Sequence, residues 1–260
     1  KMNLLIFGST GYCGRAVAEK ALEDDGIQQI ILFVRDETRA QKIFSKVHLY
    51  NDSTKDNGKN RLVFKTGDIY NRSHIQKVVK GVDAIISCLS SYARPHNQMS
   101  SFSQNLVEAV QILQPDHPNR KLHFVHFGYL RGQRPHGTKE EGIILDVTRC
   151  ISCTKYGPAI KDHGKVKHIL EESTSSMNPS SHCILDYSLF AAPNMSYKRS
   201  SDQKNYYGKE VNTVEEAIKK SRVWHSVSTY DAAQLMISHL LNVTAHPDKN
   251  LPELLCLAYK

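Results

Sequence analysis

Short continuous apolar runs alternate along this chain with segments in which apolar residues recur every three or four positions. Runs of the first kind predict buried parallel strands, and segments of the second kind predict amphipathic helices. In the first half, strands are expected at Leu4–Phe7, Ile30–Val34, Arg61–Lys65, Ala84–Leu89 and Leu122–Phe127. Helices are expected between them at Gly14–Leu22, Thr38–Lys46, Ser73–Lys80 and Met99–Leu113. This alternation predicts an α/β fold, a Rossmann-like doubly wound parallel sheet with helices on both faces.

The pattern becomes looser after Gly128. A helix is predicted at Asp162–Ser173, a strand at Cys183–Leu189, a helix at Tyr230–Leu241 and a last strand at Leu254–Tyr259. The segment Asn194–Arg222 is polar and basic, and we expect it to cross the substrate side as a long excursion. No low-complexity linker divides the chain. We therefore expect a single domain over 1–260, with a dinucleotide-binding core at 1–128 and an elaborated substrate side at 129–260.

Composition narrows the class of protein. The 40% of apolar residues is enough for a core, and no apolar run approaches a membrane span, so no membrane partner is expected. The net charge of +8 suits nucleic acid or an anionic small ligand. No aromatic-interleaved basic motif accompanies the charge, so the small ligand is favoured. Six cysteines in 260 residues, including the pair Cys150 and Cys153, are expected to be reduced thiols of a cytoplasmic protein, with no metal site.

Three glycines follow the first predicted strand in the stretch Phe7-Gly-Ser-Thr-Gly-Tyr-Cys-Gly14. Gly8 would allow a tight turn, Gly11 a close approach of backbone N–H groups to a pyrophosphate, and Gly14 close packing of the helix on the sheet. The N-terminus of the following helix supplies unpaired donors and partial positive charge. The alternative is a glycine-rich turn without a ligand. Because strand, turn and helix occur together, we predict a dinucleotide site that includes the whole turn: Gly8, Ser9, Thr10, Gly11, Tyr12, Cys13 and Gly14.

The end of the second strand decides which nicotinamide cofactor is expected. Arg35 and Arg39 can offer guanidinium groups to a ribose 2′-phosphate, which favours NADP(H). Asp36 lies beside them and keeps NAD(H) as the alternative, because a carboxylate there binds the free 2′-hydroxyl. The alternative interpretation is that both arginines are solvated surface residues without a ligand.

Two further strand ends complete the predicted cofactor site. Asp68, with Ile69 beside it, follows the third strand and is expected at the adenine edge; a helix N-cap or an Asx turn is the alternative. After the fourth strand, polar and small residues are expected near the nicotinamide ribose, or as caps of the next loop. These residues are Cys88, Leu89 and Ser90.

Several stretches resemble the atypical short-chain dehydrogenases/reductases, in particular the NmrA-like branch and the biliverdin-IXβ (flavin) reductases. They are FGSTGYCG, FVRDETR, GDIYNRSHIQKVVKGVDAIISCLSS, KDHGKVKHILEES and SRVWHSVSTYDAAQLMISHLL. The resemblance implies NADPH-dependent reduction of flavins or linear tetrapyrroles. It also implies cofactor roles for Gly8, Thr10, Gly11, Gly14, Arg35, Arg39 and Asp68. It places His163 beside the substrate as the catalytic candidate.

The chain departs from the resemblance at its proton donors. Gly128 stands about where the family has a serine, and Tyr156 and Lys161 are one residue too far apart for the usual Tyr-x-x-x-Lys pair, with Pro158 between them. Flavin reduction does not need such a donor, because the reduced ring takes its proton from water. Candidate walls for a planar acceptor are Tyr92, Phe127, Tyr129 and Tyr187, each with core packing as the alternative. Arg94, Arg131 and His163 could attract an anionic group of the acceptor, with a surface histidine as the alternative for His163.

Two functions follow from these observations. The first is an NADPH-dependent reductase that transfers hydride to a planar small-molecule acceptor such as flavin or a linear tetrapyrrole. The second is a non-catalytic NADP(H)-binding redox sensor of the NmrA-like kind that acts through a protein partner. The KDHGKVKHILEES stretch favours the first, and the missing serine and tyrosine acids favour the second.

Overall fold

We describe a computed structural model of the chain, which covers residues 1–260. The structure describes residues 1–46, 61–90, 97–113, 121–129, 157–175, 185–192, 195–196, 206–210, 227–246 and 254–259. The predicted loop Asn51–Asn60 and the residues Tyr92, Arg94, Arg131, Cys150, Cys153 and Tyr156 lie outside them.

Strands and helices alternate through the first half as the sequence predicts. The elements are β1 (Met2–Phe7), α1 (Tyr12–Leu22), β2 (Ile27–Val34), α2 (Glu37–Phe44), β3 (Leu62–Thr66), α4 (Arg72–Val79), β4 (Ala84–Ser87), α5 (Gln98–Leu113) and β5 (Leu122–Tyr129). The second half adds α7 (Gly157–Ser175), β6 (Leu185–Ala192), β7 (Met195–Ser196), β8 (Tyr206–Glu210), β9 (Val227–Ser228), α9 (Thr229–Ala245) and β10 (Leu254–Tyr259). Helix α7 begins five residues before its predicted start and contains Pro158, whose missing N–H is tolerated in a first turn.

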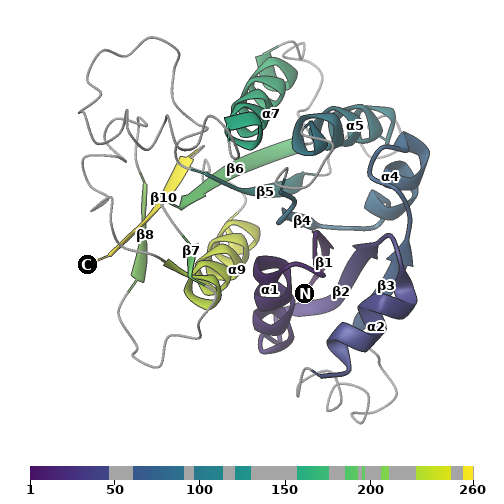
Figure 1. Ribbon diagram of the computed structural model, residues 1–260, viewed down its shortest axis with the longest axis vertical. Helices are drawn as coiled ribbons and strands as arrows, with labels where there is room; N and C mark the ends of the chain where they lie inside the picture. Colours follow the sequence, from purple (N-terminus) through teal and green to yellow (C-terminus); the bar gives the residue numbers. More distant parts are fainter. Residues whose placement is uncertain are drawn as a thin grey trace.

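The strands form one eight-stranded sheet in the order β3-β2-β1-β4-β5-β6-β10-β8. Every neighbouring pair is parallel except β10 and β8. The strand order reverses at β1, whose neighbours are β2 and β4, which confirms the Rossmann-like fold. The sheet continues through β6 and β10, so strands of both halves of the chain share it (Figure 1).

The segment Asn194–Arg222 contains more regular structure than predicted. Strand β8 closes one edge of the sheet by antiparallel pairing with β10, and β7 pairs with β9 in a separate two-stranded sheet. Polar composition did not reveal these strands, because an edge or paired strand is selected by its hydrogen-bond partners rather than by a buried apolar run.

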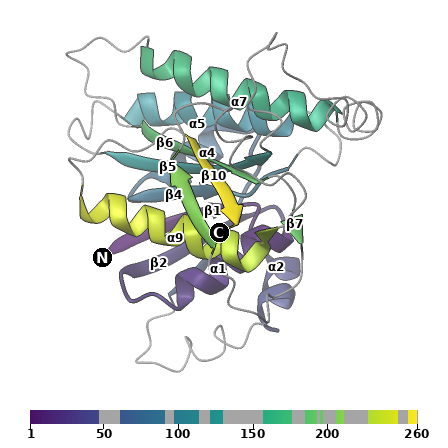
Figure 2. The same ribbon diagram turned by 90° about the vertical axis from the view of Figure 1, so that its left-hand side faces the viewer.

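Helices cover both faces of the sheet, giving the three layers visible in Figures 1 and 2. Side chains alternate along β1, so Leu5 and Phe7 enter one hydrophobic cluster while Leu4 and Ile6 enter the other. The first cluster is closed by α4, α5 and α7, and the second by α1, α2 and α9. Every one of these four β1 side chains is fully buried, which explains why the strand reads as a continuous apolar run.

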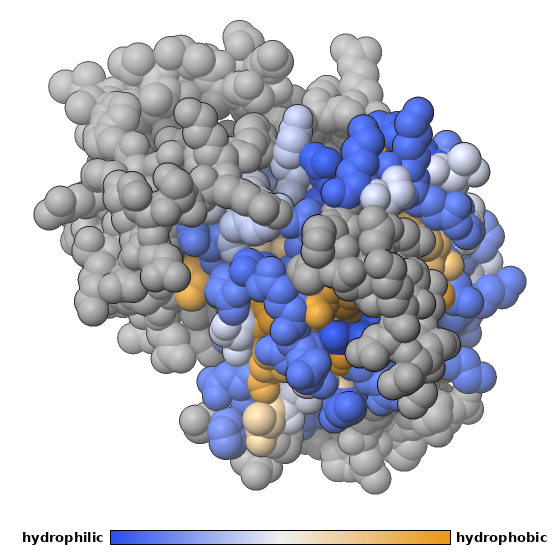
Figure 3. All heavy atoms as spheres, turned by 90° about the horizontal axis from the view of Figure 1, so that it is seen from below, coloured by the Kyte–Doolittle hydropathy of each residue, from blue (hydrophilic) through white to orange (hydrophobic). Residues whose placement is uncertain are grey.

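The surface is more polar than this interior. Seen from below in Figure 3, the described residues are mainly hydrophilic, with hydrophobic residues in small patches among them. No helix within the described ranges is long and apolar enough to cross a bilayer.

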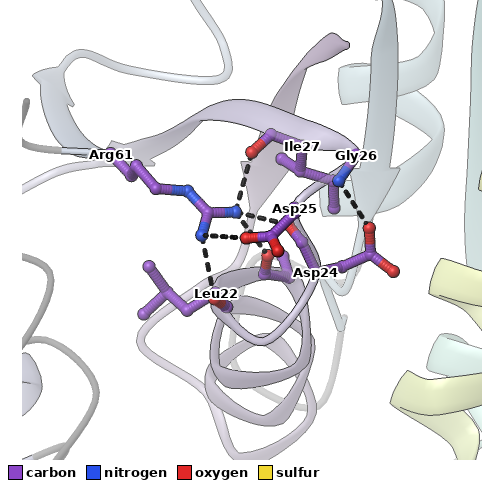
Figure 4. A network of polar contacts seen from close by, with 7 residues as sticks. Leu22, Asp24, Asp25, Gly26, Ile27 and Arg61 are labelled. Atoms are coloured by element: carbon purple, nitrogen blue, oxygen red, sulfur yellow. Dashed lines mark hydrogen bonds and ion pairs between the residues drawn. The ribbon is translucent and has the colours of Figure 1, made fainter.

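Arg61 fastens the start of β3 to the end of α1 (Figure 4). Its guanidinium donates to the backbone carbonyls of Leu22, at 3.1 Å, and Ile27, at 2.7 Å, and also to those of Ala21 and Asp24. The Asp25 carboxylate lies 4.0 Å away. The positive group therefore binds two carbonyls of the last turn of α1 and two from the following connection and the start of β2, at the end where the helix dipole is negative.

Candidate functional site: a dinucleotide turn at the carboxyl edge of the sheet

The glycine-rich turn between β1 and α1 has the backbone geometry that the sequence predicts. Gly8 has a φ of 74°, and the Gly11 N–H donates to the Gly8 carbonyl at 3.0 Å. A Cβ atom at Gly8 would lie 2.8 Å from the Cys88 carbonyl group, and one at Gly14 would lie 2.3 Å from the Gly8 oxygen. Neither position has room for a side chain, so the turn is pressed against both its own helix and the end of β4.

The N-terminus of α1 differs from those of other helices in the fold. Helices α2, α4 and α9 each begin at a residue whose side chain accepts from a backbone N–H: Asp36, Asn71 and Ser228. Helix α1 begins at Gly11, which has no side chain to cap it. The N-cap residue of α1 therefore leaves this helix end without a side-chain acceptor, which is the arrangement of helix ends that bind phosphate.

Side chains in the turn add polar and charged groups near the N-terminus of α1. Ser9 is 1% exposed, and its hydroxyl has no hydrogen-bond partner among the described residues. Tyr12 is exposed, and the Arg15 guanidinium lies 4.8 Å from the centre of its ring. Arg15 was missed as a site candidate from the sequence, although its place directly after the third glycine puts a cation in the first turn of α1. A buried unpaired hydroxyl and a cation beside uncapped N–H groups fit a pyrophosphate.

The end of β2 carries the predicted pair of arginines. Arg35 and Arg39 are exposed, and neither guanidinium forms an ion pair with a residue that the structure describes. Asp36 is also exposed, but its Oδ1 accepts from the Arg39 N–H at 2.9 Å and caps α2. The carboxylate is therefore held by its own helix, while both cations remain available to an anion.

Asp68 lies in an Asx turn after β3. Its Oδ1 accepts from the Tyr70 N–H at 3.0 Å, and its own N–H donates to His74 Nδ1 at 3.2 Å. The N-cap of α4 is Asn71 rather than Asp68. Burial raises the pKa of Tyr70, Asp68 and Asp162 raise it further, and Arg35 opposes them. The turn after β3 thus lies within electrostatic reach of the β2 end, although Ile69, predicted beside the cofactor, is a buried core residue.

The end of β4 lies against the glycine turn. The Cys88 N–H donates to the Phe7 carbonyl at 3.0 Å, and the Sγ atoms of Cys88 and Cys13 are 3.6 Å apart. Leu89 is buried, and Ser90 is partly exposed. Ser87, the last residue of β4, is fully buried, with no hydrogen-bond partner for its hydroxyl within the described part of the chain. The predicted strand-end residues thus lie together at the carboxyl ends of β1 and β4, the neighbouring strands at which the strand order reverses.

His163 occupies the interior rather than the surface. It is 2% exposed, and its Nδ1 lies 3.1 Å from Nε2 of His126, a fully buried residue of β5. Burial lowers the pKa of His163 to about 3. Burial also lowers the pKa of His126, with His163 adding to the shift and Asp162 opposing it. The alternative of a surface histidine is therefore wrong, and so is its suggested role as a cation, because the ring is neutral at pH 7.

Asp162, the neighbour of His163, caps another helix. Its carboxylate accepts from the backbone N–H of Met99 at 2.8 Å and of Ser100 at 3.1 Å, and from the Ser100 hydroxyl. The adjacent residues Asp162 and His163 thus attach α7 to α5 and to β5. No local pattern predicts this cap, because the partners are more than sixty positions apart in the chain.

The aromatic residues predicted to line an acceptor site lie in different environments. Tyr187 is buried within the hydrophobic cluster under α5 and α7, so core packing accounts for it. Phe127 is partly buried against the opposite cluster. Gly128, the position of the missing serine, is buried on β5 opposite Ala191 of β6. The side chains of Tyr129 and Lys161 lie outside the description.

Comparisons with known proteins agree with the geometry of the turn. Residues 8–117 match the family model described as NAD(P)H-binding. No curated protein sequence matches the chain.

Solved structures share the fold at low sequence identity. A wide-type short-chain dehydrogenase/reductase from Veillonella parvula, in complex with NADP, superposes with a TM-score of 0.61 at 11% identity, over 99% of this chain and 94% of that one. A Rossmann-fold NAD(P)-binding protein from Shigella flexneri gives 0.56 at 16% identity, over 99% and 93%. An NADPH-dependent quinone oxidoreductase from Escherichia coli, with NADPH, gives 0.55 at 14% identity, over 98% and 69%. The predicted cofactor class is confirmed: this chain has a Rossmann-like fold whose amino-terminal part matches the NAD(P)H-binding family.

Proposed function

We propose that the protein is an NADPH-dependent reductase that transfers hydride to a planar acceptor such as a flavin or a linear tetrapyrrole. The observation that carries the proposal is the pair of exposed guanidinium groups of Arg35 and Arg39 at the end of β2, neither ion-paired with a residue that the structure describes, near a helix N-terminus without a side-chain cap. Asp36, the residue that would favour NAD(H), is engaged by the Arg39 N–H. This distribution of charge suits a 2′-phosphate better than a free 2′-hydroxyl.

The chain's own residues would then bind and orient the cofactor. The N–H groups of the first turn of α1 hold the pyrophosphate, with Arg15 beside them, and the two arginines hold the ribose phosphate. Residues at the ends of β4 and β5 orient the nicotinamide. When bound, the cofactor supplies the hydride, and the acceptor takes its proton from water. The buried His163 contacts His126 of β5, and its predicted catalytic contact with the acceptor remains part of this proposal.

The NADP(H)-binding sensor remains the second candidate on two observations. The residue at the usual serine position is Gly128, and His163, the histidine that the family resemblance places beside the substrate, is buried and uncharged. A protein without a positioned acid can still bind the nucleotide and report its occupancy to a partner. It would not reduce ketones, which need a proton in the transition state.

Removal of Arg35 tests the cofactor preference. Arg35→Ala is expected to weaken NADPH binding by about tenfold to a hundredfold, the usual range for losing a charge-assisted contact, while NADH binding changes less than about threefold. Isothermal calorimetry measures both. Arg72→Ala is the matched control, because Arg72 is an exposed arginine that pairs with Glu108 on α5. Equal losses for the two nucleotides would refute the phosphate role.

Turnover separates the reductase from the sensor. With NADPH and FMN, and separately with biliverdin, the absorbance of the reduced cofactor should fall faster than in a buffer blank. Tight NADPH binding without turnover of either acceptor would retire the reductase in favour of the sensor.

A further inference from the structure

Two cysteines from distant parts of the chain meet inside the candidate cofactor site. Cys13 lies in the first turn of α1, and Cys88 directly follows β4. Both are free thiols and partly exposed, and their sulfur atoms are 3.6 Å apart. A disulfide needs a sulfur–sulfur distance of about 2.05 Å, so the pair must close by about 1.5 Å, which is within reach of a change in side-chain torsion.

The backbone around the two thiols already holds them together. Gly8 is in contact with the Cys88 carbonyl, and the Cys88 N–H bonds to the carbonyl of Phe7, the last residue of β1. The turn and the strand end are therefore fixed to each other without any cross-link. A bond between the sulfur atoms would require little movement of the chain, since the close approach is imposed by the fold.

We propose that Cys13 and Cys88 form a reversible disulfide, a modification site that controls access of the dinucleotide to the turn; the control of binding rests on the proposed function. Oxidised glutathione, or another small disulfide, is the oxidant. The Cys13 sulfur attacks one sulfur of glutathione disulfide and releases one glutathione as its thiolate. The Cys88 sulfur then attacks the mixed disulfide at Cys13 and releases the second. Two protein thiols are oxidised, two molecules of reduced glutathione form, and the two thiol protons pass to them.

The order of these steps follows from the environment of the two sulfurs. The Cys88 thiol donates to the Cys13 sulfur, and this bond together with burial raises the pKa of Cys88. Cys88 is thus held as the thiol, which makes Cys13 the attacking residue and Cys88 the resolving one.

The disulfide and the dinucleotide act on the same backbone. The N–H groups beside Cys13 would bind the pyrophosphate, and the bond would lock this turn against the end of β4 so that it could not adjust around the ligand. The oxidised protein should therefore bind the nucleotide more weakly. Thermodynamic reciprocity requires bound nucleotide to oppose disulfide formation by the same factor.

The test uses the full chain in glutathione buffers of increasing oxidised fraction, with and without saturating NADP⁺. Acid-quenched samples are mapped by mass spectrometry for a link between the peptides that contain Cys13 and Cys88. We expect the link to form, to be removed by dithiothreitol, and to require about a tenfold more oxidising buffer when NADP⁺ is present. Calorimetry on the linked protein should give about a tenfold weaker NADP⁺ affinity.

Two variants complete the test. Cys13→Ser should abolish the link and the effect of oxidation on binding, whereas Cys150→Ser should change neither. Absence of the Cys13–Cys88 link at full oxidation, or equal affinity of linked and reduced protein, would overturn the proposal. If the link forms but the reduced protein binds no dinucleotide, the proposed function fails while the modification site is upheld.

Discussion

The two ends of helix α1 differ in whether side chains of the protein bind their backbone polar groups. At its carboxyl end, the Arg61 guanidinium donates hydrogen bonds to four backbone carbonyls, so these carbonyls do not depend on water for a donor. At its amino end, Gly11 offers no cap, Ser9 keeps a buried unpaired hydroxyl among the described residues, and two thiols face each other. Both ends of a helix carry unpaired backbone groups, so the difference lies in what satisfies them.

The comparison separates groups that hold the fold from groups kept available for a ligand. Polar atoms at the Arg61 end are satisfied by the protein and therefore contribute to stability. At the glycine end, Gly11 supplies no side-chain acceptor to the first turn, and the Ser9 hydroxyl has no partner among the described residues, an arrangement that favours ligand binding over stability. On the other face of the sheet, the buried rings of His126 and His163 contact each other and so belong to the first kind of group.

The largest expected effect comes from giving the amino end of α1 a cap of its own. In Gly11→Asp, the new carboxylate would accept from first-turn N–H groups and place negative charge where the pyrophosphate binds. We expect NADPH binding to weaken by at least about a hundredfold, or about 2.7 kcal/mol, while the free energy of unfolding changes by less than about 1 kcal/mol. Calorimetry and urea unfolding measure the two. Retained NADPH affinity would mean that the phosphate does not sit at this helix end.

A smaller effect of the opposite kind is expected at the carboxyl end. Arg61→Met keeps an unbranched apolar stem but removes the hydrogen bonds that the guanidinium donates to the four carbonyls. We expect the free energy of unfolding to fall by about 2 kcal/mol, with NADPH affinity unchanged within about twofold. The matched control is Arg72→Met, which removes an exposed ion pair and should cost less than about 0.5 kcal/mol. A loss of binding equal to the loss of stability would contradict the division between the two ends.

The buried histidine pair gives a third, pH-dependent difference. The folded pKa of His163 is about 3, below its ordinary value of 6.5, so the unfolded chain binds the proton more readily between these values. Stability is therefore full above pH 6.5 and falls as the pH decreases toward 3. His163 alone should remove about 2 kcal/mol between pH 7 and pH 5.

Unfolding of the His163→Asn variant at both pH values measures this contribution, since its stability should depend less on pH than that of the parent chain. His168→Asn is the control, because His168 is exposed beside Glu172 on the same helix. An unchanged pH dependence in His163→Asn would show that the ring is not buried in neutral form.

Much of the fold was readable from local patterns. The alternation of apolar runs and amphipathic segments located the strands of the first half to within a few residues, because strands buried on both faces must be continuously apolar. The glycine spacing predicted the turn, since the required backbone shape excludes side chains at Gly8 and Gly14. Local patterns did not reveal the antiparallel strand β8, the burial of His163 or the capping role of Asp162.

By itself, the sequence determined the β–α alternation, the turn after β1 and the two arginines after β2, because each is fixed by residues close together in the chain. Only the tertiary structure decided which polar groups have hydrogen-bond partners and which residues those partners are. Arg61 meets the end of α1, Asp162 meets the start of α5, and Cys13 meets Cys88 across 75 positions. Such contacts depend on the order of the strands within the sheet, and no local stretch of the sequence encodes that order.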